Sequence, residues 1–219
     1  MPATIEAVKI AIFAAVEIGS AMRKTHGCSA LDAVGKEAAA GYLRPMKTTT
    51  PAAAKSKPAQ VRPIAPGVSI GHVHLKVSDL DRAVAFYRDV LGFEVTDRFG
   101  RNAVFLSAGG YHHHIGLNTW ESQGGSPPPA GTTGLYHAAI LYPTRADLAD
   151  ALRRLLAHGV RLDGASDHGV SEALYLRDPD GNGLELYWDR PREQWPRRAD
   201  GSVAMFTEVL DLESLLAER

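Results

Sequence analysis

The stretch that decides the fold is His72–Phe93, HVHLKVSDLDRAVAFYRDVLGF. Its first six residues alternate between apolar and polar or basic side chains, which is typical of a strand with one buried face. Ser78 and Asp81 then resemble a helix capping box, and apolar residues recur at helical spacing until Gly92. The stretch therefore predicts a strand followed by an amphipathic helix.

The same order of elements occurs twice, which predicts a repeated unit. After the first helix, strands are predicted at Glu94–Arg98, Ala103–Ser107 and His113–Asn118. In the second copy HAAILY (137–142) is the strand, Thr144 and Asp147 supply the cap, and an apolar helical stripe ends at Gly159. Strands near Leu162 and at Ala173–Leu176 and Gly183–Trp188 complete it. Because one βαβββ unit cannot bury both faces of its sheet, we expect an α+β fold of two paired modules, with helices outside and the mixed sheet cupped around a cleft.

The rest of the chain is expected to flank this domain. Residues 1–44 form a partly helical extension, and 45–66, rich in Thr, Ala, Lys and Pro, form a disordered linker. The domain covers 67–195, with modules at about 67–120 and 134–190, and 196–219 form a C-terminal tail. Met46 stands at the start of the linker and suggests the hypothesis that translation begins there; the intact mass of protein from the native host would decide.

Charge and composition exclude several classes of partner. With 24 Lys and Arg against 25 Asp and Glu the formal net charge is -1, so no long-range field favours nucleic acid or an anionic membrane surface. Cys28 is the single cysteine and cannot form an internal disulfide. Lys9 and Glu17 interrupt the apolar stretch Ala7–Met22, so we expect no membrane segment and a cytoplasmic protein.

The repeat places two histidines at equivalent positions, because His72 and His137 each open the first strand of a module. Strand alternation sends Leu75 to the helix-covered face and His72 to the other, and in the last strand Glu185 faces away from the core. A single strand histidine is more often structural, but the equivalence favours ligands. Two His and one carboxylate leave coordination positions open, as non-haem iron(II) requires.

Three segments resemble the vicinal-oxygen-chelate superfamily, and within it catechol 2,3-dioxygenase-like proteins. They are IGHVHLKVSDLDRAVAFYRDVLGF (70–93), GLYHAAILYPTRADLADAL (134–152) and LYLRDPDGNGLELYWDRP (174–191). The resemblance covers roughly Val68–Leu216 and implies His72, His137 and Glu185 as the metal ligands. It implies Fe(II) as the metal, with Mn(II) or another divalent ion as the alternative.

The resemblance to extradiol enzymes also implies further catalytic residues. DHGVSEALY (167–175) supplies His168, which contacts substrate and the oxygen species, and Tyr175, which contacts a substrate hydroxyl oxygen. A histidine in the last strand of the first module falls on His113 or on its neighbour His114, and strand alternation does not decide between them. His74 points into the same cleft, and a substrate contact is our hypothesis for it.

The leading hypothesis is therefore cleavage of a catechol-type aromatic diol by O2. A metal-dependent lyase or thiol transferase of the same fold is the first alternative, as in glyoxalase I or fosfomycin-resistance proteins. A metal-free protein that binds an aromatic ligand, as in bleomycin resistance, is the second. Many extradiol enzymes have four βαβββ units, so part of a pocket or subunit contact is missing from two, and a homodimer could supply it.

Overall fold

The computed structural model describes residues 62–219. The expectations for residues 1–44, for Met46 and for most of the 45–66 linker lie outside the described residues. Within 62–219, no helix is both long enough and apolar enough to cross a membrane.

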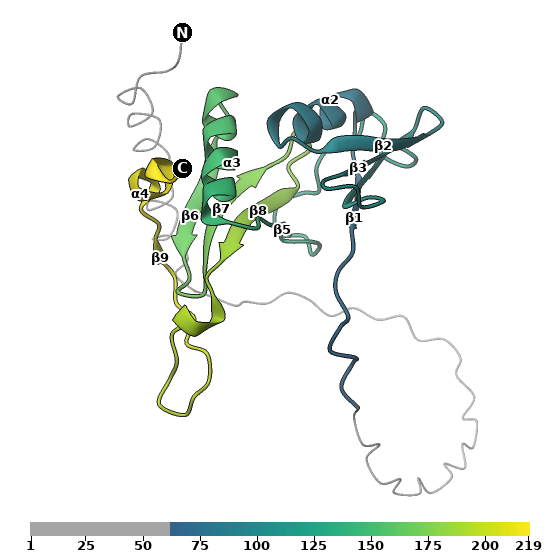
Figure 1. Cartoon of the computed structure of the whole chain (residues 1–219). Helices are drawn as coiled ribbons and strands as arrows, with labels where there is room; N and C mark the ends of the chain where they lie inside the picture. The colour runs from purple at the N-terminus through teal and green to yellow at the C-terminus, as the bar shows by residue number, and fades with distance from the viewer. Residues whose placement is uncertain (1–61) are drawn as a thin grey trace, which may run out of the picture. The chain divides into compact units, whose positions relative to one another are not determined.

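The first module is a four-stranded mixed sheet with one helical segment (Figure 1). Its elements are β1 (Val73–Lys76), α2 (Leu80–Ala85), the π-helical turn η2 (Phe86–Val90), β2 (Glu94–Phe99), β3 (Ala103–Ser107) and β4 (Ile115–Asn118). The strand order is β1-β4-β3-β2, and β1 runs parallel to β4 while the other pairs are antiparallel. The helical segment connects the edge strand β1 to the opposite edge strand β2.

The second module repeats this plan and adds a strand from the C-terminal tail. Its elements are β5 (Ala138–Leu141), α3 (Arg145–Ala157), β6 (Leu162–Asp167), β7 (Ser171–Arg177), β8 (Gly183–Asp189), the 3-10 turn η3 (Arg192–Gln194), β9 (Glu208–Val209) and α4 (Leu212–Ala217). The order is β5-β8-β7-β6-β9, with β5 parallel to β8. The tail therefore joins this sheet through β9, and α4 packs beside α3 (Figure 1).

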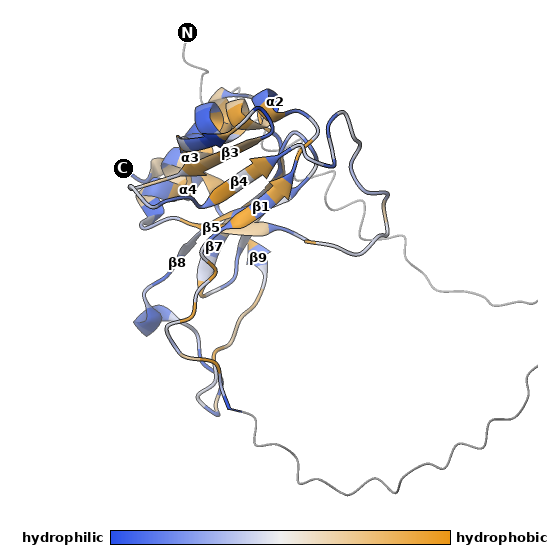
Figure 2. Cartoon of the chain, turned by 90° about the vertical axis from the view of Figure 1, so that its right-hand side faces the viewer, coloured by the Kyte–Doolittle hydropathy of each residue, from blue (hydrophilic) through white to orange (hydrophobic). Residues whose placement is uncertain are grey.

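The alternation predicted for the strands is confirmed by burial. Leu75 in β1 and Leu184 and Leu186 in β8 are buried, whereas His74 is exposed and Glu185 is only partly covered. Figure 2 shows hydrophobic segments on β1 and β4, and the helices carry both hydrophobic and hydrophilic residues. Apolar residues from both modules form one core cluster. Two faces of different chemistry therefore exist on each sheet, and the histidines lie on the one that does not hold the core leucines.

One of the two predicted helix caps is confirmed and the other is wrong. Thr144 caps α3 in a capping box with Asp147, as its sequence predicts. In α2, however, the N-cap is Asp79, whose side chain accepts from the backbone N–H of Arg82. Ser78 is not the cap because its N–H and hydroxyl are both directed to Asp180, 102 residues along the chain.

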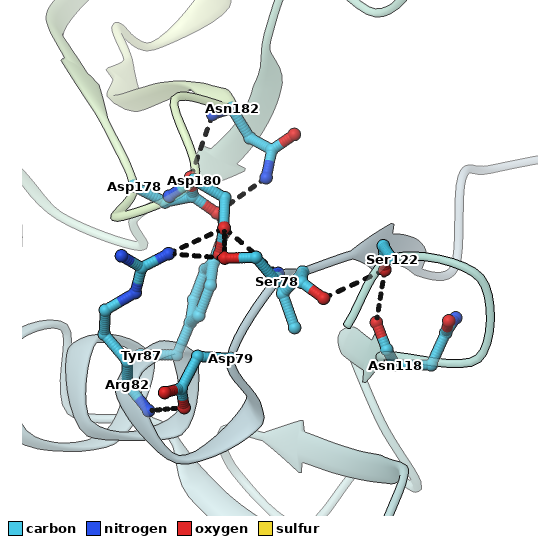
Figure 3. Close-up of polar contacts among 10 residues, drawn as sticks. Ser78, Asp79, Arg82, Tyr87, Asn118, Ser122, Asp178, Asp180 and Asn182 are labelled. Carbon is cyan, nitrogen blue, oxygen red and sulfur yellow. Dashed lines mark hydrogen bonds and ion pairs between the residues drawn. The ribbon is translucent and has the colours of Figure 1, made fainter. Parts of the chain in front are cut away.

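That contact belongs to a polar connection between the modules, which we call the module clasp: Ser78, Arg82 and Tyr87 with Asp178 and Asp180 (Figure 3). Asp180 Oδ1 accepts from the Ser78 N–H at 3.0 Å and from Arg82 Nη2 at 2.7 Å. Tyr87, fully buried, donates its hydroxyl to Asp178 Oδ2 at 3.1 Å. The clasp therefore attaches the first helix to the turn that precedes β8.

Candidate metal and acid–base site

Two of the three predicted metal ligands lie together in the second module. His137 directly precedes β5, Glu185 lies in the neighbouring strand β8, and His137 Nε2 is 2.9 Å from Glu185 Oε2. The approach depends on Gly183, because a Cβ there would lie 2.1 Å from the Tyr136 carbonyl oxygen. A side chain at that position would push the residues before β5 away from β8 and separate the pair.

Glu185 continues into a hydrogen-bonded chain. Tyr175 in β7 is the register partner of Glu185, so both side chains lie on the same face. The Tyr175 hydroxyl donates to Glu185 Oε1 at 2.9 Å and lies 2.8 Å from His168 Nε2. His168 stands in the turn between β6 and β7. The chain His168–Tyr175–Glu185–His137, which we call the relay, thus joins two predicted catalytic residues to two predicted ligands.

Burial and charge keep the Tyr175 phenol protonated. Burial raises the pKa of Tyr175 well above its ordinary value, and the hydrogen bond to Glu185 and the negative charge of that carboxylate raise it further. A phenol in this state remains a hydrogen-bond donor throughout the neutral range. Tyr175 therefore suits the role of orienting an oxygen atom.

The predicted residues of the first module form a second group. The His72 and His113 rings lie 4.4 Å apart between centroids, and His113 also packs on Phe105 at 5.0 Å. Phe105 contacts the His74 ring as well, at 5.9 Å. Partial burial lowers the pKa of His113, and the nearby His72 lowers it further; the pKa of His74 is lowered for the same two reasons. His113 and His74 therefore favour the neutral form.

His114 lies apart from this group. Its Nδ1 is 3.0 Å from the Ser107 hydroxyl and accepts from the backbone N–H of Ala108 at 3.3 Å. Its ring faces Phe93 and Tyr111. Of the two alternatives for the catalytic histidine of the first module, the geometry favours His113, because only this one contacts a predicted ligand.

Comparison with known proteins identifies the family. The sequence model of the Glyoxalase/Bleomycin resistance protein/Dioxygenase superfamily matches residues 69–186 of this chain. The chain belongs to this superfamily. All predicted site residues fall within the matched range, which ends inside β8, so these residues lie in the family's domain and not in the flanking segments.

Several curated relatives in this superfamily carry names of ring-cleaving enzymes. A catechol-2,3-dioxygenase of Bacillus subtilis is 44% identical over 150 residues, which cover 68% of this chain and 51% of the relative. A biphenyl-2,3-diol 1,2-dioxygenase of Rhodococcus globerulus is 37% identical over 124 residues, which cover 55% of this chain and 63% of the relative. A 2,3-dihydroxybiphenyl 1,2-dioxygenase of Geobacillus genomosp. 3, named as manganese-dependent, is 28% identical over 129 residues. The match covers 58% of this chain and 38% of the relative. The chain thus spans about half the length of the first relative.

One of the dioxygenase relatives is named as manganese-dependent, and the His137–Glu185 pair of this chain fits a metal. A separation of 2.9 Å between Nε2 and Oε2 is that of a hydrogen bond. It is also that of two adjacent ligands in an octahedral site, which lie about 3 Å apart when each is about 2.1 Å from the ion. His137 Nδ1, the ring nitrogen that does not face Glu185, is buried and has no hydrogen-bond partner among the described residues.

His72 is the ligand that the structure does not bring to this pair. Within residues 62–219, no three His, Cys, Asp or Glu side chains are gathered closely enough to hold a metal ion. His72 lies instead against His113. The three-ligand set therefore stays a prediction, of which two members, His137 and Glu185, already lie together.

Sequence reasoning missed two groups at the site, both at the C-terminal end of the chain. The Phe206 carbonyl oxygen is 2.9 Å from His168 Nδ1, and the Thr207 hydroxyl is 3.3 Å from the same atom. Neither residue type has a sequence signature for this contact, since one group is backbone and the other a lone hydroxyl. The only signal was that the resemblance to extradiol enzymes continues through DGSVAMFTEVLDLESLL (200–216).

Proposed function

We propose that this chain forms the metal-binding and acid–base centre of an extradiol dioxygenase, which cleaves a catechol-type aromatic diol with O2. The relay carries the proposal, because it links a candidate ligand carboxylate, Glu185, to a candidate proton acceptor, His168, through Tyr175. A protein that only sequesters a ligand has no need of such a chain. The names of the relatives support a dioxygenase over a lyase.

Iron(II) is the proposed metal, with manganese(II) as the alternative that one relative's name suggests. His137 and Glu185 would hold it, with His72 as the third ligand. Bound there, such a metal supplies coordination sites for both vicinal oxygens and a path for electrons from the diol to O2.

The side chains of the chain itself provide the proton chemistry. A catechol hydroxyl must lose its proton before the ring becomes a good electron donor, and a neutral His168 can accept that proton at one ring nitrogen and return it later. Tyr175 orients a substrate oxygen through its hydroxyl, since a misplacement of about 1 Å costs roughly 100-fold in rate. His113 serves as a second proton carrier, and His74 contacts the substrate ring.

The test is anaerobic reconstitution with iron(II) or manganese(II), followed by catechol, 3-methylcatechol or 2,3-dihydroxybiphenyl and oxygen. We expect oxygen uptake together with a yellow ring-fission product. Metal-loaded protein that consumes none of these diols but turns over a glutathione hemithioacetal would replace the dioxygenase with a lyase. Binding of a catechol without turnover of any substrate would leave only the resistance-type function.

Measurements of metal affinity and of turnover distinguish the metal ligands from the proton-transfer residue. His137→Ala and His72→Ala should each weaken iron(II) binding, whereas His168→Gln should lower turnover and leave the metal bound. His158→Gln is the matched control, because His158 caps the end of α3, away from the relay. Metal loss in the His168 variant would contradict its proton-transfer role, and full metal affinity in His72→Ala would remove it from the ligand set.

A homodimer remains part of the proposal, because this chain spans about half of the first relative. A second copy of the chain would supply the part of the pocket or the subunit contact that two modules lack. Sedimentation at working concentrations tests this: a monomer with full activity would show that one chain completes the pocket.

A further inference from the structure

The segment after β8 leaves the sheet and then returns to it at His168. From Arg190 it runs through η3 and a hairpin held by the bridge Arg197↔Val203, and the Ala204 N–H donates to the Pro196 carbonyl. The Phe206 N–H then donates to the His168 carbonyl. Strand β9 finally pairs with β6 through Ser166↔Val209 and Asp167↔Glu208. We call residues 190–209 the C-terminal strap.

Both ends of the strap are anchored to the second module. At its start, Arg190 Nη2 contacts Asp167 Oδ2 at 2.6 Å and Glu172 Oε1 at 2.9 Å. Beyond its end, α4 buries Leu212 and Leu215. Glu172, nearly fully buried, also accepts from Arg145, which holds Glu218 at the end of the chain. The strap is therefore fixed relative to the sheet and able to position a neighbouring side chain.

The strap holds the outer nitrogen of His168. The Phe206 carbonyl lies 2.9 Å from His168 Nδ1, and because a carbonyl only accepts, Nδ1 must carry the hydrogen. The Thr207 hydroxyl, at 3.3 Å, shares that hydrogen as a second acceptor. A neutral imidazole has one N–H, so the inner nitrogen Nε2, 2.8 Å from the Tyr175 hydroxyl, is left as an acceptor. The single Tyr175 hydrogen then serves either Nε2 or Glu185 Oε1 at any one time.

The strap approaches closely at a glycine. Gly169, next to His168, has a φ of +75°, and a Cβ there would lie 2.4 Å from the Phe206 ring and 2.8 Å from Pro196. Phe206 therefore packs directly against the backbone of the turn that contains His168. Any residue but glycine at position 169 would press the strap away from the histidine.

We propose that the strap is a positioning element of the catalytic site: the Phe206 carbonyl and Thr207 hydroxyl fix the ring orientation and tautomer of His168, so that Nε2 is the atom that takes the substrate proton. The inference rests on the proposed function for the identity of the reaction. The tautomer itself depends only on the contacts at Nδ1. Thr207 is a positioning residue, since it acts through His168 and does not face Tyr175.

The tautomer of His168 can be measured in the absence of catalysis. Two-bond 1H–15N correlation spectra of the metal-free full-length chain distinguish the two tautomers, and His168→Gln assigns the signal. We expect the Nδ1–H form in the wild type. A predominant Nε2–H form would overturn the proposal even in an active dioxygenase, whereas the Nδ1–H form in a protein that cleaves no catechol would overturn only the proposed function.

Kinetics of Thr207 variants test the positioning role in the metal-loaded enzyme. Thr207→Val keeps the shape and removes the hydroxyl, so we expect kcat to fall about tenfold while KM changes less than about twofold. Thr207→Ser should restore kcat, and metal affinity should not change. The control is Thr132→Val, whose hydroxyl contacts only the Pro129 carbonyl in an exposed loop. A loss of metal affinity, or no rescue by serine, would reduce Thr207 to a structural role.

A second pair of variants moves the whole strap. Gly169→Ala places a methyl group against Phe206 and should shift His168 toward a mixture of tautomers, with the same fall in kcat. Gly159→Ala is the matched control, because Gly159, outside the strap, also has a positive φ, +65°, but nothing lies within 4 Å of its added Cβ. Equal spectra and rates for the two variants would show that the contact with Phe206 does not hold His168.

Discussion

At the residue scale, Tyr175 has one hydroxyl hydrogen and two neighbours that accept it, Glu185 Oε1 at 2.9 Å and His168 Nε2 at 2.8 Å. Tyr175→Phe keeps the ring and breaks the relay. We expect kcat to fall roughly 100-fold, the cost of a substrate oxygen that is no longer held in place. Steady-state kinetics with a catechol measure the effect. Tyr187→Phe, on the same strand face but outside the relay, is the control, and an equal loss there would count against the relay.

The relay was partly predictable because strand alternation has a period of two. Glu185 between two apolar residues had to face away from the core, and its register partner Tyr175 had to join it. The choice between His113 and His114 was not predictable in this way. Strand β4 begins only at Ile115, so both histidines precede it, and a contact with Ser107 decides where His114 turns.

At the scale of elements, the two helix starts show why local patterns succeed or fail. Thr144 and Ser78 both carry a hydroxyl three residues before an aspartate. Thr144 forms the predicted box because nothing distant competes for it. Ser78 instead contacts Asp180, and Asp79 takes over the cap. A tertiary contact between the modules thus overrides the capping pattern, and residues 72–93 alone carry no sign of it.

This contact predicts the effect of Asp180→Asn. Asp180 Oδ1 accepts from Ser78 and Arg82, and its Oδ2 is buried without a hydrogen-bond partner among the described residues (Figure 3). Loss of the charge should lower the free energy of unfolding by about 1–3 kcal/mol, as chemical denaturation would measure. Asp89→Asn, in the helical segment that the clasp attaches, removes an exposed carboxylate that is ion-paired with its neighbour Arg88, and it should have little effect. Similar losses for both would show that the clasp does not stabilise the module contact.

Tyr142, which directly follows β5, should make the stability of the fold depend on pH in the alkaline range. Burial raises the pKa of Tyr142 from 10.0 to about 12. Because the folded chain keeps this proton longer than the unfolded chain, the stabilisation is complete below pH 10 and is lost as pH rises toward 12. Urea unfolding at pH 9 to 11.5 should show a steeper loss of stability in the wild type than in Tyr142→Phe. Parallel curves would mean that Tyr142 titrates alike in both states.

At the scale of the whole molecule, the sequence predicted the two modules and the face on which the histidines lie, but not how the modules meet. Each module follows from periodicity within about 50 residues. Their relation depends on side chains about 100 residues apart, such as Tyr87 with Asp178, 91 residues away. For this reason the repeat suggests the convergence of His72 with His137 and Glu185 as a hypothesis, but periodicity alone does not determine it.

The shared core predicts that both modules unfold together. Apolar residues of both belong to one cluster, so a cavity in one module should destabilise the other equally. Leu106→Ala, at a fully buried position in β3, should cost about 2–5 kcal/mol. Tryptophan fluorescence reports each module separately in variants that retain only Trp120, after β4, or only Trp188, in β8.

We expect both probes to show the same unfolding midpoint in urea, and the same shift of that midpoint when Leu106→Ala is added. Val209→Ala, at an exposed position of the edge strand β9, is the control and should shift neither probe appreciably. If Leu106→Ala moves only the Trp120 transition, the modules are independent folding units joined by the clasp alone. In that case Asp180→Asn would alter how the histidines of the two sheets face one another without altering the stability of either sheet.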